Sequence, residues 1–198
     1  MCSDMETDRL RLRPWRESDA EALYRLASDP EVGPRAGWPP HQSVEESRGI
    51  IRTVFNNDTT WAIVWKETDE VVGAMGYGPS CDCNLPAGEE EPTVGYWVGR
   101  PYWNRGICSE ALQAMIDRIR ATTPIRSLIS GHFVDNPASG RVMEKCGFLP
   151  TGDLVYDERL YGGKGRAIRV LRLVFFSGCF LPAGHGGVET LRATSPAR

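Results

Sequence analysis

The sequence predicts an α/β protein in which helices flank one mixed sheet. Short runs with strand-like alternation are interspersed with longer runs whose apolar residues recur at helical spacing. The resulting order is strand, two helices, three strands, helix, strand, helix and two strands, without an internal repeat. A chain of 198 residues is long enough for one domain with a substantial core.

The first half of the chain is expected to hold a strand, two helices and two more strands. Arginine alternates with leucine in residues 9–14, which predicts the first strand. Capping-box sequences at residues 18–21 and 43–46, each running from serine to glutamate, predict two helix starts. A loop rich in glycine and proline, residues 33–40, separates the helices. The two following strands are expected at residues 60–66 and 71–77.

The second half continues the alternation after a long loop at residues 78–91. Asn136 and Pro137 predict a helix start by a side-chain cap and a first-turn proline, and Gly147 predicts the end of that helix. The other expected elements are strands at 92–98, 127–134, 152–161 and 166–176, and a helix that ends near residue 122. We therefore expect a single domain at residues 1–176 and a poorly structured C-terminal tail at 177–198.

Composition excludes several classes of protein. A net charge of −3 argues against a general nucleic-acid binder, which normally presents a basic face. No apolar run reaches the roughly 18 residues of a membrane span, and the polar N-terminus does not resemble a signal peptide. The 6 cysteines lack the density of a disulfide scaffold, which favours reduced thiols and a cytoplasmic location. Cys81 and Cys83 have no partner ligands at a fixed spacing, so we expect no metal site.

The most informative segment is Tyr-Trp-Asn-Arg-Gly-Ile-Cys-Ser-Glu-Ala-Leu at residues 102–112. It joins a strand to an amphipathic helix through a turn that contains Gly106, Cys108 and Ser109, all small enough to let a ligand approach the backbone. The first turn of a helix carries unpaired N–H groups and partial positive charge, which suit a diphosphate. Neither the Gly-x-x-x-x-Gly-Lys loop nor the Gly-x-Gly-x-x-Gly fingerprint occurs in the sequence. The segment therefore predicts a phosphorylated cofactor held by backbone amides.

Three stretches together resemble the GNAT superfamily of acyl-CoA-dependent N-acetyltransferases. They are Gly-Tyr-Trp-Val at residues 95–98 with the turn segment that follows, residues 135–148, and the opening Glu-Thr-Asp-Arg-Leu-Arg-Leu-Arg at residues 6–13. They look most like the branch of ribosomal-protein N-terminal acetyltransferases, the RimJ/RimL type, and the resemblance runs from about residue 6 to 176. It implies a GNAT fold, with a central mixed and largely antiparallel sheet splayed between two parallel strands and flanked by helices.

The resemblance also implies a binding site for acetyl-CoA, the acyl-donor co-substrate. The pantetheine arm would insert between the two parallel strands and bond to main-chain groups of Trp97 and Val98, one of which would polarise the thioester carbonyl. The diphosphate would meet main-chain N–H groups of the turn. The Asn136 side chain would contact the pantetheine arm, in addition to its structural role as a helix cap. The turn residues implied are Arg105, Gly106, Ile107, Cys108 and Ser109.

Two residues of the expected site have alternative interpretations. Cys108 is interpreted as a small residue that takes the place of glycine or alanine rather than as a nucleophile. Ser139 lies where the family places a hydroxyl close to the cofactor sulfur, so it either donates a proton to the departing thiolate or is only a solvated first-turn serine. Met143 occupies the position of a tyrosine acid that many GNAT enzymes use.

The general base is the least determined part of the site. An attacking amine must lose its proton, which requires a base within hydrogen-bond reach, directly or through water. The branch often has a glutamate where this chain has Thr93, whereas Glu91 lies two residues earlier on the same face of an extended strand. Glu91 is thus a candidate base, although it also belongs to a run of three glutamates typical of a solvated loop. His132 is a second candidate, with packing in a strand as its alternative role.

The function expected from these residues is transfer of an acetyl group from acetyl-CoA to a primary amine by direct attack. The acceptor is a protein N-terminus or a small-molecule amine, and Trp38 in the 33–40 loop either lines its pocket or packs on the core. The alternative is a non-catalytic acyl-CoA-binding or sensing module that has lost its base. We expect neither nucleic-acid nor membrane partners, and the apolar segment at 174–176 is a candidate surface for a homodimer.

Overall fold

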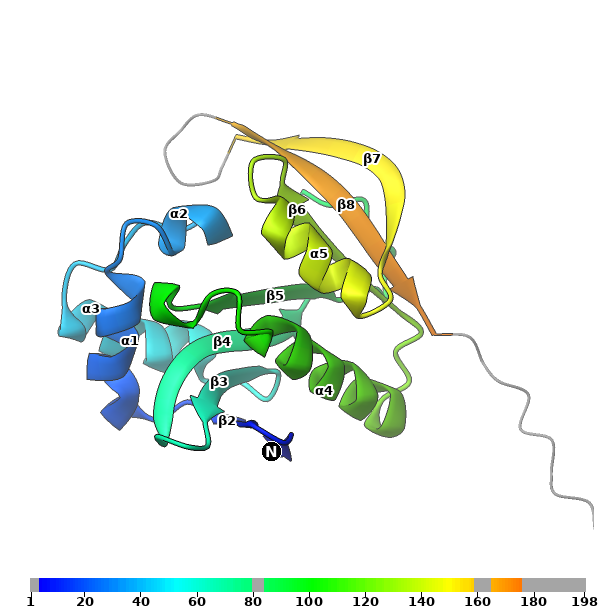
Figure 1. Ribbon diagram of the computed structural model, residues 1–198. Helices are drawn as coiled ribbons and strands as arrows, with labels where there is room; N and C mark the ends of the chain where they lie inside the picture. The colour runs from blue at the N-terminus through cyan, green and yellow to red at the C-terminus, as the bar shows by residue number, and fades with distance from the viewer. Residues whose placement is uncertain (1–3, 80–83, 159–164, 176–198) are drawn as a thin grey trace, which may run out of the picture.

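The computed structural model describes residues 4–79, 84–158 and 165–175. Its strands form one sheet in the order β1-β2-β3-β4-β5-β6-β8-β7 (Figure 1). Neighbouring strands are antiparallel except for the central pair β5 and β6, which is parallel. The predicted mixed and largely antiparallel sheet is therefore confirmed. The strands are β1 (Met5–Glu6), β2 (Leu10–Pro14), β3 (Thr60–Trp65), β4 (Glu70–Gly78), β5 (Thr93–Val98), β6 (Ser127–Phe133), β7 (Leu149–Asp157) and β8 (Arg166–Val174).

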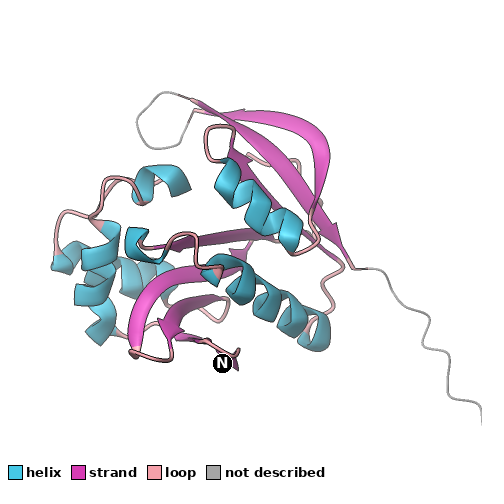
Figure 2. Ribbon diagram, in the orientation of Figure 1, coloured by secondary structure: helices cyan, strands magenta, loops and turns pink. Residues whose placement is uncertain are grey.

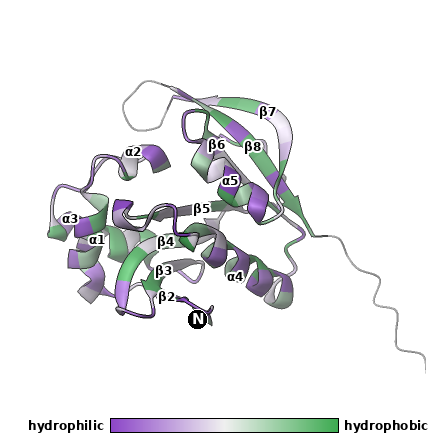
Figure 3. Ribbon diagram, in the orientation of Figure 1, coloured by the Kyte–Doolittle hydropathy of each residue, from purple (hydrophilic) through white to green (hydrophobic). Residues whose placement is uncertain are grey.

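Helices cover both faces of the sheet, as Figure 2 shows. In β3, Trp61 and Ile63 pack with α4 on one face, whereas Ala62 and Val64 pack with α1 on the other. Helices α4 and α5 carry both hydrophobic and hydrophilic residues (Figure 3), as expected for helices with one face against a sheet. The helices are α1 (Ala20–Ala27), α2 (Gly33–Ala36), α3 (Val44–Ile50), α4 (Ile107–Thr122) and α5 (Pro137–Lys145), with short helical turns η1 (Glu17–Asp19), η2 (Ile51–Phe55) and η4 (Arg100–Tyr102).

The two predicted capping boxes have different outcomes. Ser43 accepts a hydrogen bond from the Glu46 N–H at 3.0 Å, so the cap of α3 is confirmed. The predicted box at residues 18–21 is wrong, because α1 begins without a side-chain cap. Asp19 instead accepts from the Arg16 N–H at 2.9 Å and binds the buried Arg13 guanidinium at 2.7 and 2.8 Å. This ion pair fixes the chain between β2 and α1.

The C-terminal elements follow the prediction with shifted boundaries. Gly147 has φ = 88°, a left-handed conformation that glycine adopts readily, and it follows the last turn of α5 as predicted. Strand β7 begins at Leu149, earlier than expected. In the candidate dimer segment, Phe175 is buried with its ring under the Arg120 guanidinium at 4.7 Å, whereas Val174 is 48% exposed and residue 176 lies outside the described residues. Cys81, Cys83 and the predicted tail lie outside the described residues.

Within those described ranges, no helix is long and apolar enough to cross a membrane.

Candidate active site

The turn before α4 has the backbone geometry that the sequence predicted for a ligand-binding turn. Gly106 is the N-terminal cap of α4 and has φ = 77° and ψ = 5°. Asn104, with φ = 60°, is also left-handed. Glycine adopts such angles without steric cost and asparagine tolerates them better than most residues, which explains why this local sequence can form so tight a turn.

The first turn of α4 offers main-chain donors. The first helical hydrogen bond runs from the Glu110 N–H to the Gly106 carbonyl at 3.0 Å. The N–H groups of Ile107, Cys108 and Ser109 have no hydrogen-bond partner among the described residues. Unpaired N–H groups at the positive end of a 16-residue helix form a site suited to an anion. The geometry therefore meets the requirement of the predicted diphosphate site.

The two thiols beside this turn are unsuited to nucleophilic attack. Burial, followed by the neighbouring Cys146, raises the pKa of the Cys108 thiol to about 12. Burial likewise raises the pKa of Cys146 to about 11, and its sulfur donates to the Ser109 carbonyl at 3.4 Å. Both groups stay protonated near neutral pH, and only the thiolate is a good nucleophile. The small size of Cys108, rather than its reactivity, fits its position in the turn.

The sheet opens between β5 and β6. Their register contains Thr93 opposite Ile129, and no further residue pair joins these two fully described strands. The Ser130 hydroxyl donates to the Val94 carbonyl at 2.8 Å. No hydrogen bond joins a later residue of β5 to β6, and both strands are fully described. Beyond Val94 the two strands diverge, so the C-terminal half of β5 has a free edge toward α5.

The main-chain groups that face this opening belong to alternate residues of β5. The Gly99 N–H donates to the Val72 carbonyl at 2.9 Å, which fixes the phase of the antiparallel ladder with β4. By this alternation the main-chain groups of Trp97 point to β4, and those of Tyr96 and Val98 point to the opening. The Val98 carbonyl accepts from the Trp103 indole N–H at 2.9 Å. The prediction for Trp97 therefore needs correction, since Val98 alone of the predicted pair faces the opening.

Tyr96 is a site residue that the sequence reasoning missed. Its side chain crosses from β5 to α5, where the phenol donates to the Ser139 carbonyl at 2.8 Å and lies 3.1 Å from the Ser139 hydroxyl. A phenol has one hydrogen, and a carbonyl can only accept, so the Ser139 hydroxyl must be the donor in the second contact. Burial raises the pKa of Tyr96, which keeps the phenol protonated. Ser139 is thus held at the opening, and its hydroxyl hydrogen must leave the Tyr96 oxygen to reach a ligand.

Asn136 and His132 lie near Ser139, and Asn136 differs from its predicted role as a helix cap. The Asn136 side chain donates to the Arg35 carbonyl at 3.2 Å instead of capping α5, so the predicted side-chain cap is wrong. The bond ties α2 to the start of α5. The His132 Nδ1 lies 2.8 Å from the Phe133 carbonyl, and its Nε2 would lie 2.6 Å from a Cβ added at Gly140. A carbonyl only accepts, so the Nδ1 carries the hydrogen in this contact.

Glu91 is not placed as the predicted general base. Its carboxylate binds Arg172 through two nitrogens at 2.7 and 3.0 Å and accepts from the Gly88 N–H at 3.2 Å. Burial alone would raise the pKa of Glu91, but the bonds from Arg172, Gly88 and Ser127 outweigh it and lower the pKa below 4.5. Glu91 also precedes Thr93, at the closed end of the β5–β6 pair. We interpret it as part of a structural ion pair, neither a base nor a solvated loop residue.

Trp38 packs on the face of β5 opposite to Tyr96. Its ring lies 5.5 Å from the Trp97 ring in an edge-to-face arrangement and 5.4 Å from the His41 ring. Burial lowers the pKa of His41, whose Nδ1 lies 2.8 Å from the Ser47 hydroxyl. The half-buried Trp38 therefore joins the 33–40 loop to β5. This contact is compatible with both interpretations of Trp38, because the ring packs on Trp97 and is still partly exposed.

The opened sheet and the free amides of α4 together define a site that can hold an extended, phosphorylated ligand along β5. The family described as acetyltransferase (GNAT) domain matches residues 9–149, so the chain belongs to the GNAT family of acetyltransferases.

Curated relatives agree with this assignment, and solved structures share the fold. The chain is 32% identical over 171 residues to the uncharacterized N-acetyltransferase p20 of Bacillus licheniformis, a match that covers 83% of this chain and 90% of that protein. It is 28% identical over 161 residues to the ribosomal-protein-serine acetyltransferase of Escherichia coli (strain K12), covering 78% and 87%. The structure of RimL, the ribosomal L7/L12 alpha-N-protein acetyltransferase, in complex with coenzyme A superposes with a TM-score of 0.72 at 22% identity, covering 87% of this chain and 98% of that one.

Proposed function

We propose that this enzyme transfers the acetyl group of acetyl-CoA to a primary amine by direct attack. The observation that carries the proposal is the set of N–H groups at Ile107, Cys108 and Ser109, beside the opening between β5 and β6, that have no partner in the described part of the chain. The diphosphate of the coenzyme binds these groups, and the pantetheine arm runs along the free edge of β5. The RimL structure that contains coenzyme A supports this assignment of the ligand.

The chemistry follows from the groups at the opening. The Val98 N–H faces the thioester and stabilises the oxyanion that forms when the amine attacks the carbonyl carbon. The tetrahedral intermediate then collapses and the C–S bond breaks. The proton that the amine nitrogen loses passes through the Ser139 hydroxyl to the thiolate of coenzyme A, so the serine regains the proton that it gives. The attack is direct, since the thiols beside the turn, Cys108 and Cys146, stay protonated and are poor nucleophiles. The Asn136 side chain contacts the pantetheine arm in exchange for its bond to the Arg35 carbonyl, because its main-chain N–H is already bound to the Phe133 carbonyl.

The acceptor approaches from the face of β5 that carries Trp38 and Trp97. The half-buried indole rings form an apolar wall that accommodates the carbon chain next to the amine. A protein N-terminus and a small-molecule amine both fit this proposal. The similarity to a ribosomal-protein-serine acetyltransferase favours testing N-terminal peptides first.

The direct test is an assay of thiol release from acetyl-CoA with a panel of acceptors. The panel contains peptides with a free N-terminal serine, the same peptides blocked at the N-terminus, and small amines. Thiol release that requires a free amine, with an acetylated product by mass spectrometry, supports the proposal. Coenzyme A binding without turnover on any amine would favour a sensing module instead.

Ser139→Ala is expected to lower kcat about tenfold and to leave KM for acetyl-CoA nearly unchanged. The alanine cannot protonate the departing thiolate, whereas the diphosphate contacts remain. The loss is modest because a thiol is an easier leaving group than an amine. Ser139→Thr keeps the hydroxyl and should retain most of the activity. Equal kcat for all three proteins in steady-state assays would remove Ser139 from the mechanism.

His132→Gln tests the remaining candidate base. If the His132 Nε2 accepts the amine proton through water, kcat at pH 7 should fall about a hundredfold, within the usual range for general bases. Raising the pH toward the pKa of the amine should recover much of the loss, because the acceptor then needs no base. A pH profile of kcat parallel to that of the wild type would assign His132 to packing against Gly140.

A further inference from the structure

Glu110 places a carboxylate in the first turn of the helix that is proposed to bind a diphosphate. A negative side chain there stabilises the isolated helix, but it also competes with an anionic ligand for the same positive helix end and repels it. The proposed function therefore requires that the charge of Glu110 be compensated.

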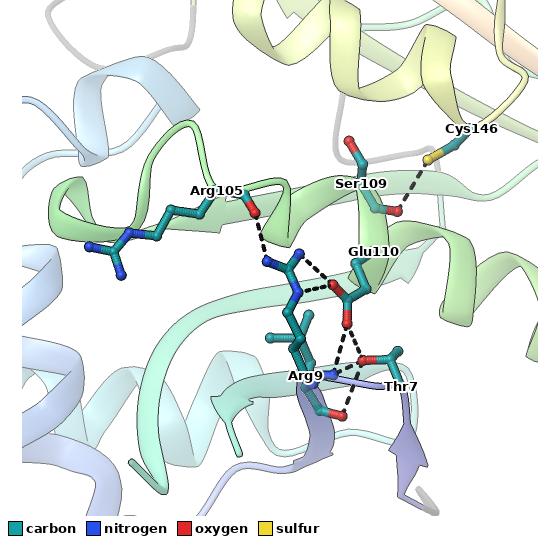
Figure 4. A network of polar contacts seen from close by, with 7 residues as sticks. Thr7, Arg9, Arg105, Ser109, Glu110 and Cys146 are labelled. Atoms are coloured by element: carbon teal, nitrogen blue, oxygen red, sulfur yellow. Dashed lines mark hydrogen bonds and ion pairs between the residues drawn. The ribbon is translucent and has the colours of Figure 1, made fainter. Parts of the chain in front are cut away.

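The compensation comes from the segment just before β2, far away in the sequence. Arg9 donates to Glu110 from its main-chain N–H at 3.2 Å and from Nε at 2.7 Å, and its Nη2 lies 2.6 Å from the carboxylate. The Thr7 hydroxyl donates to the same carboxylate. Figure 4 shows the Glu110 side chain pointing to Arg9 and Thr7. These bonds outweigh the burial that would raise the pKa of Glu110, and they lower it.

The same guanidinium also holds the turn. Arg9 Nη1 donates to the Arg105 carbonyl at 3.1 Å, and Arg9 Nη2 lies 3.5 Å from the position of a Cβ at Gly106. The described peptide bonds are all trans, so the Arg105 carbonyl and the Gly106 N–H point in opposite directions. Fixing this carbonyl against Arg9 therefore aims the Gly106 N–H away from Arg9.

The guanidinium is itself held in place by an aromatic ring. It lies 5.6 Å from the centre of the Trp65 ring, in β3, which limits the rotamers of a side chain that is 44% exposed. Arg9 is thus ordered before any ligand arrives, as a positioning residue must be.

We propose that Arg9 is a positioning residue for the coenzyme diphosphate: it neutralises Glu110 and orients the Arg105–Gly106 peptide so that its N–H faces the ligand. The inference rests on the proposed function, because it assigns the diphosphate to the first turn of α4. It adds the residues before β2 to the binding machinery, although they need not contact the ligand.

The experiment compares Arg9→Met, Arg9→Lys and the double variant Arg9→Met/Glu110→Gln. Arg11→Met is the matched control, because Arg11 lies two residues further along, in β2, and pairs with the exposed Asp69. Calorimetry gives Kd for coenzyme A, and steady-state kinetics compares acetyl-CoA with S-acetylpantetheine, which has no diphosphate. Thermal unfolding confirms that each variant is folded.

Arg9→Met is expected to weaken coenzyme A binding about tenfold, as for the loss of one charged hydrogen-bonded contact. Its kcat/KM for S-acetylpantetheine should stay within about twofold of wild type, since that substrate does not use the turn. Arg9→Lys should have a smaller effect, and Glu110→Gln in the Arg9→Met background should recover part of the affinity by removing the uncompensated charge. Arg11→Met should bind like the wild type.

Two results would overturn the inference. Wild-type affinity in Arg9→Met would show that neither the charge nor the orientation matters. Equal losses with acetyl-CoA and S-acetylpantetheine would show that Arg9 only supports the fold. Failure of the wild-type protein to bind coenzyme A is a different outcome, because it would reject the proposed function itself.

Discussion

Replacing Gly106 by valine is expected to weaken coenzyme A binding about a hundredfold, as for the loss of two hydrogen bonds to a charged ligand. The position has φ = 77°, which a β-branched residue strongly disfavours. Space is not the obstacle, because the nearest atom to an added Cβ, Arg9 Nη2, is 3.5 Å away. The valine must therefore change the backbone angles of the turn, which turns the N–H groups of Ile107 and Cys108 away from the diphosphate.

Gly152 provides a matched control for this substitution. It is also left-handed, with φ = 91°, and lies in the exposed strand β7 with open space around it. Gly152→Val should carry a similar conformational cost to stability and leave Kd for coenzyme A unchanged. Gly106→Asn should retain more affinity than Gly106→Val, because asparagine tolerates left-handed angles. Calorimetric affinities that rank the two Gly106 variants equally, or that fall in Gly152→Val, would contradict this account.

The sequence was sufficient for features that depend on neighbouring residues. The glycine turn, the amphipathic α4 and the left-handed end of α5 at Gly147 follow from local conformational preferences, and the structure contains them. The alternation of strand and helix patterns likewise predicted the sheet and its flanking helices. These features need no knowledge of distant contacts, so sequence spacing was enough to predict them.

The sequence was not sufficient for contacts that the fold creates between distant segments. Arg9 meets Glu110 across 101 positions, and Tyr96 meets Ser139 across 43. Neither the tyrosine in β5 nor the arginine just before β2 has a neighbour in the sequence that indicates its distant partner. Trp97 was predicted on the wrong side of β5 for a related reason, because the phase of the ladder depends on the pairing with β4. The residues whose main-chain groups face the opening are Tyr96 and Val98. Both belong to the Gly-Tyr-Trp-Val string, which is the one signal in the sequence that could have indicated them.

The partner of Glu91 also could not be predicted from the sequence, and this partner decides whether Glu91 can act as a base. Its spacing from Thr93 placed it on the expected face of an extended strand, and this was the reason to propose it as a base. Its partner, Arg172, is 81 positions away in β8. Once the carboxylate is bound on both oxygens, the pair links the loop before β5 to β8 near the closed end of the opening. Its expected role is therefore stability.

Glu91→Gln is expected to lower the free energy of unfolding by about 2 kcal/mol, and Arg172→Met by about 3 kcal/mol. The arginine substitution is the more costly because it leaves a carboxylate that is 6% exposed without its cation, whereas Arg172 is 35% exposed and can be hydrated in Glu91→Gln. Urea unfolding at pH 7 measures both values. Glu45→Gln, which breaks an exposed pair with Arg48, should change stability by less than about 0.5 kcal/mol.

The stability that Glu91 contributes should decrease at low pH. The folded pKa of Glu91 is lowered from 4.5, so the stability it contributes is fully present above pH 4.5 and is lost as the pH falls through the folded value. The difference in unfolding free energy between wild type and Glu91→Gln should therefore be constant from about pH 7 to pH 5.5 and shrink below pH 4.5.

Kinetics separates the stabilising role of Glu91 from base catalysis. Well below its melting temperature, Glu91→Gln should keep kcat within about threefold of wild type, whereas removal of a general base costs about a hundredfold or more. A loss of that size at unchanged stability would restore Glu91 to the active site.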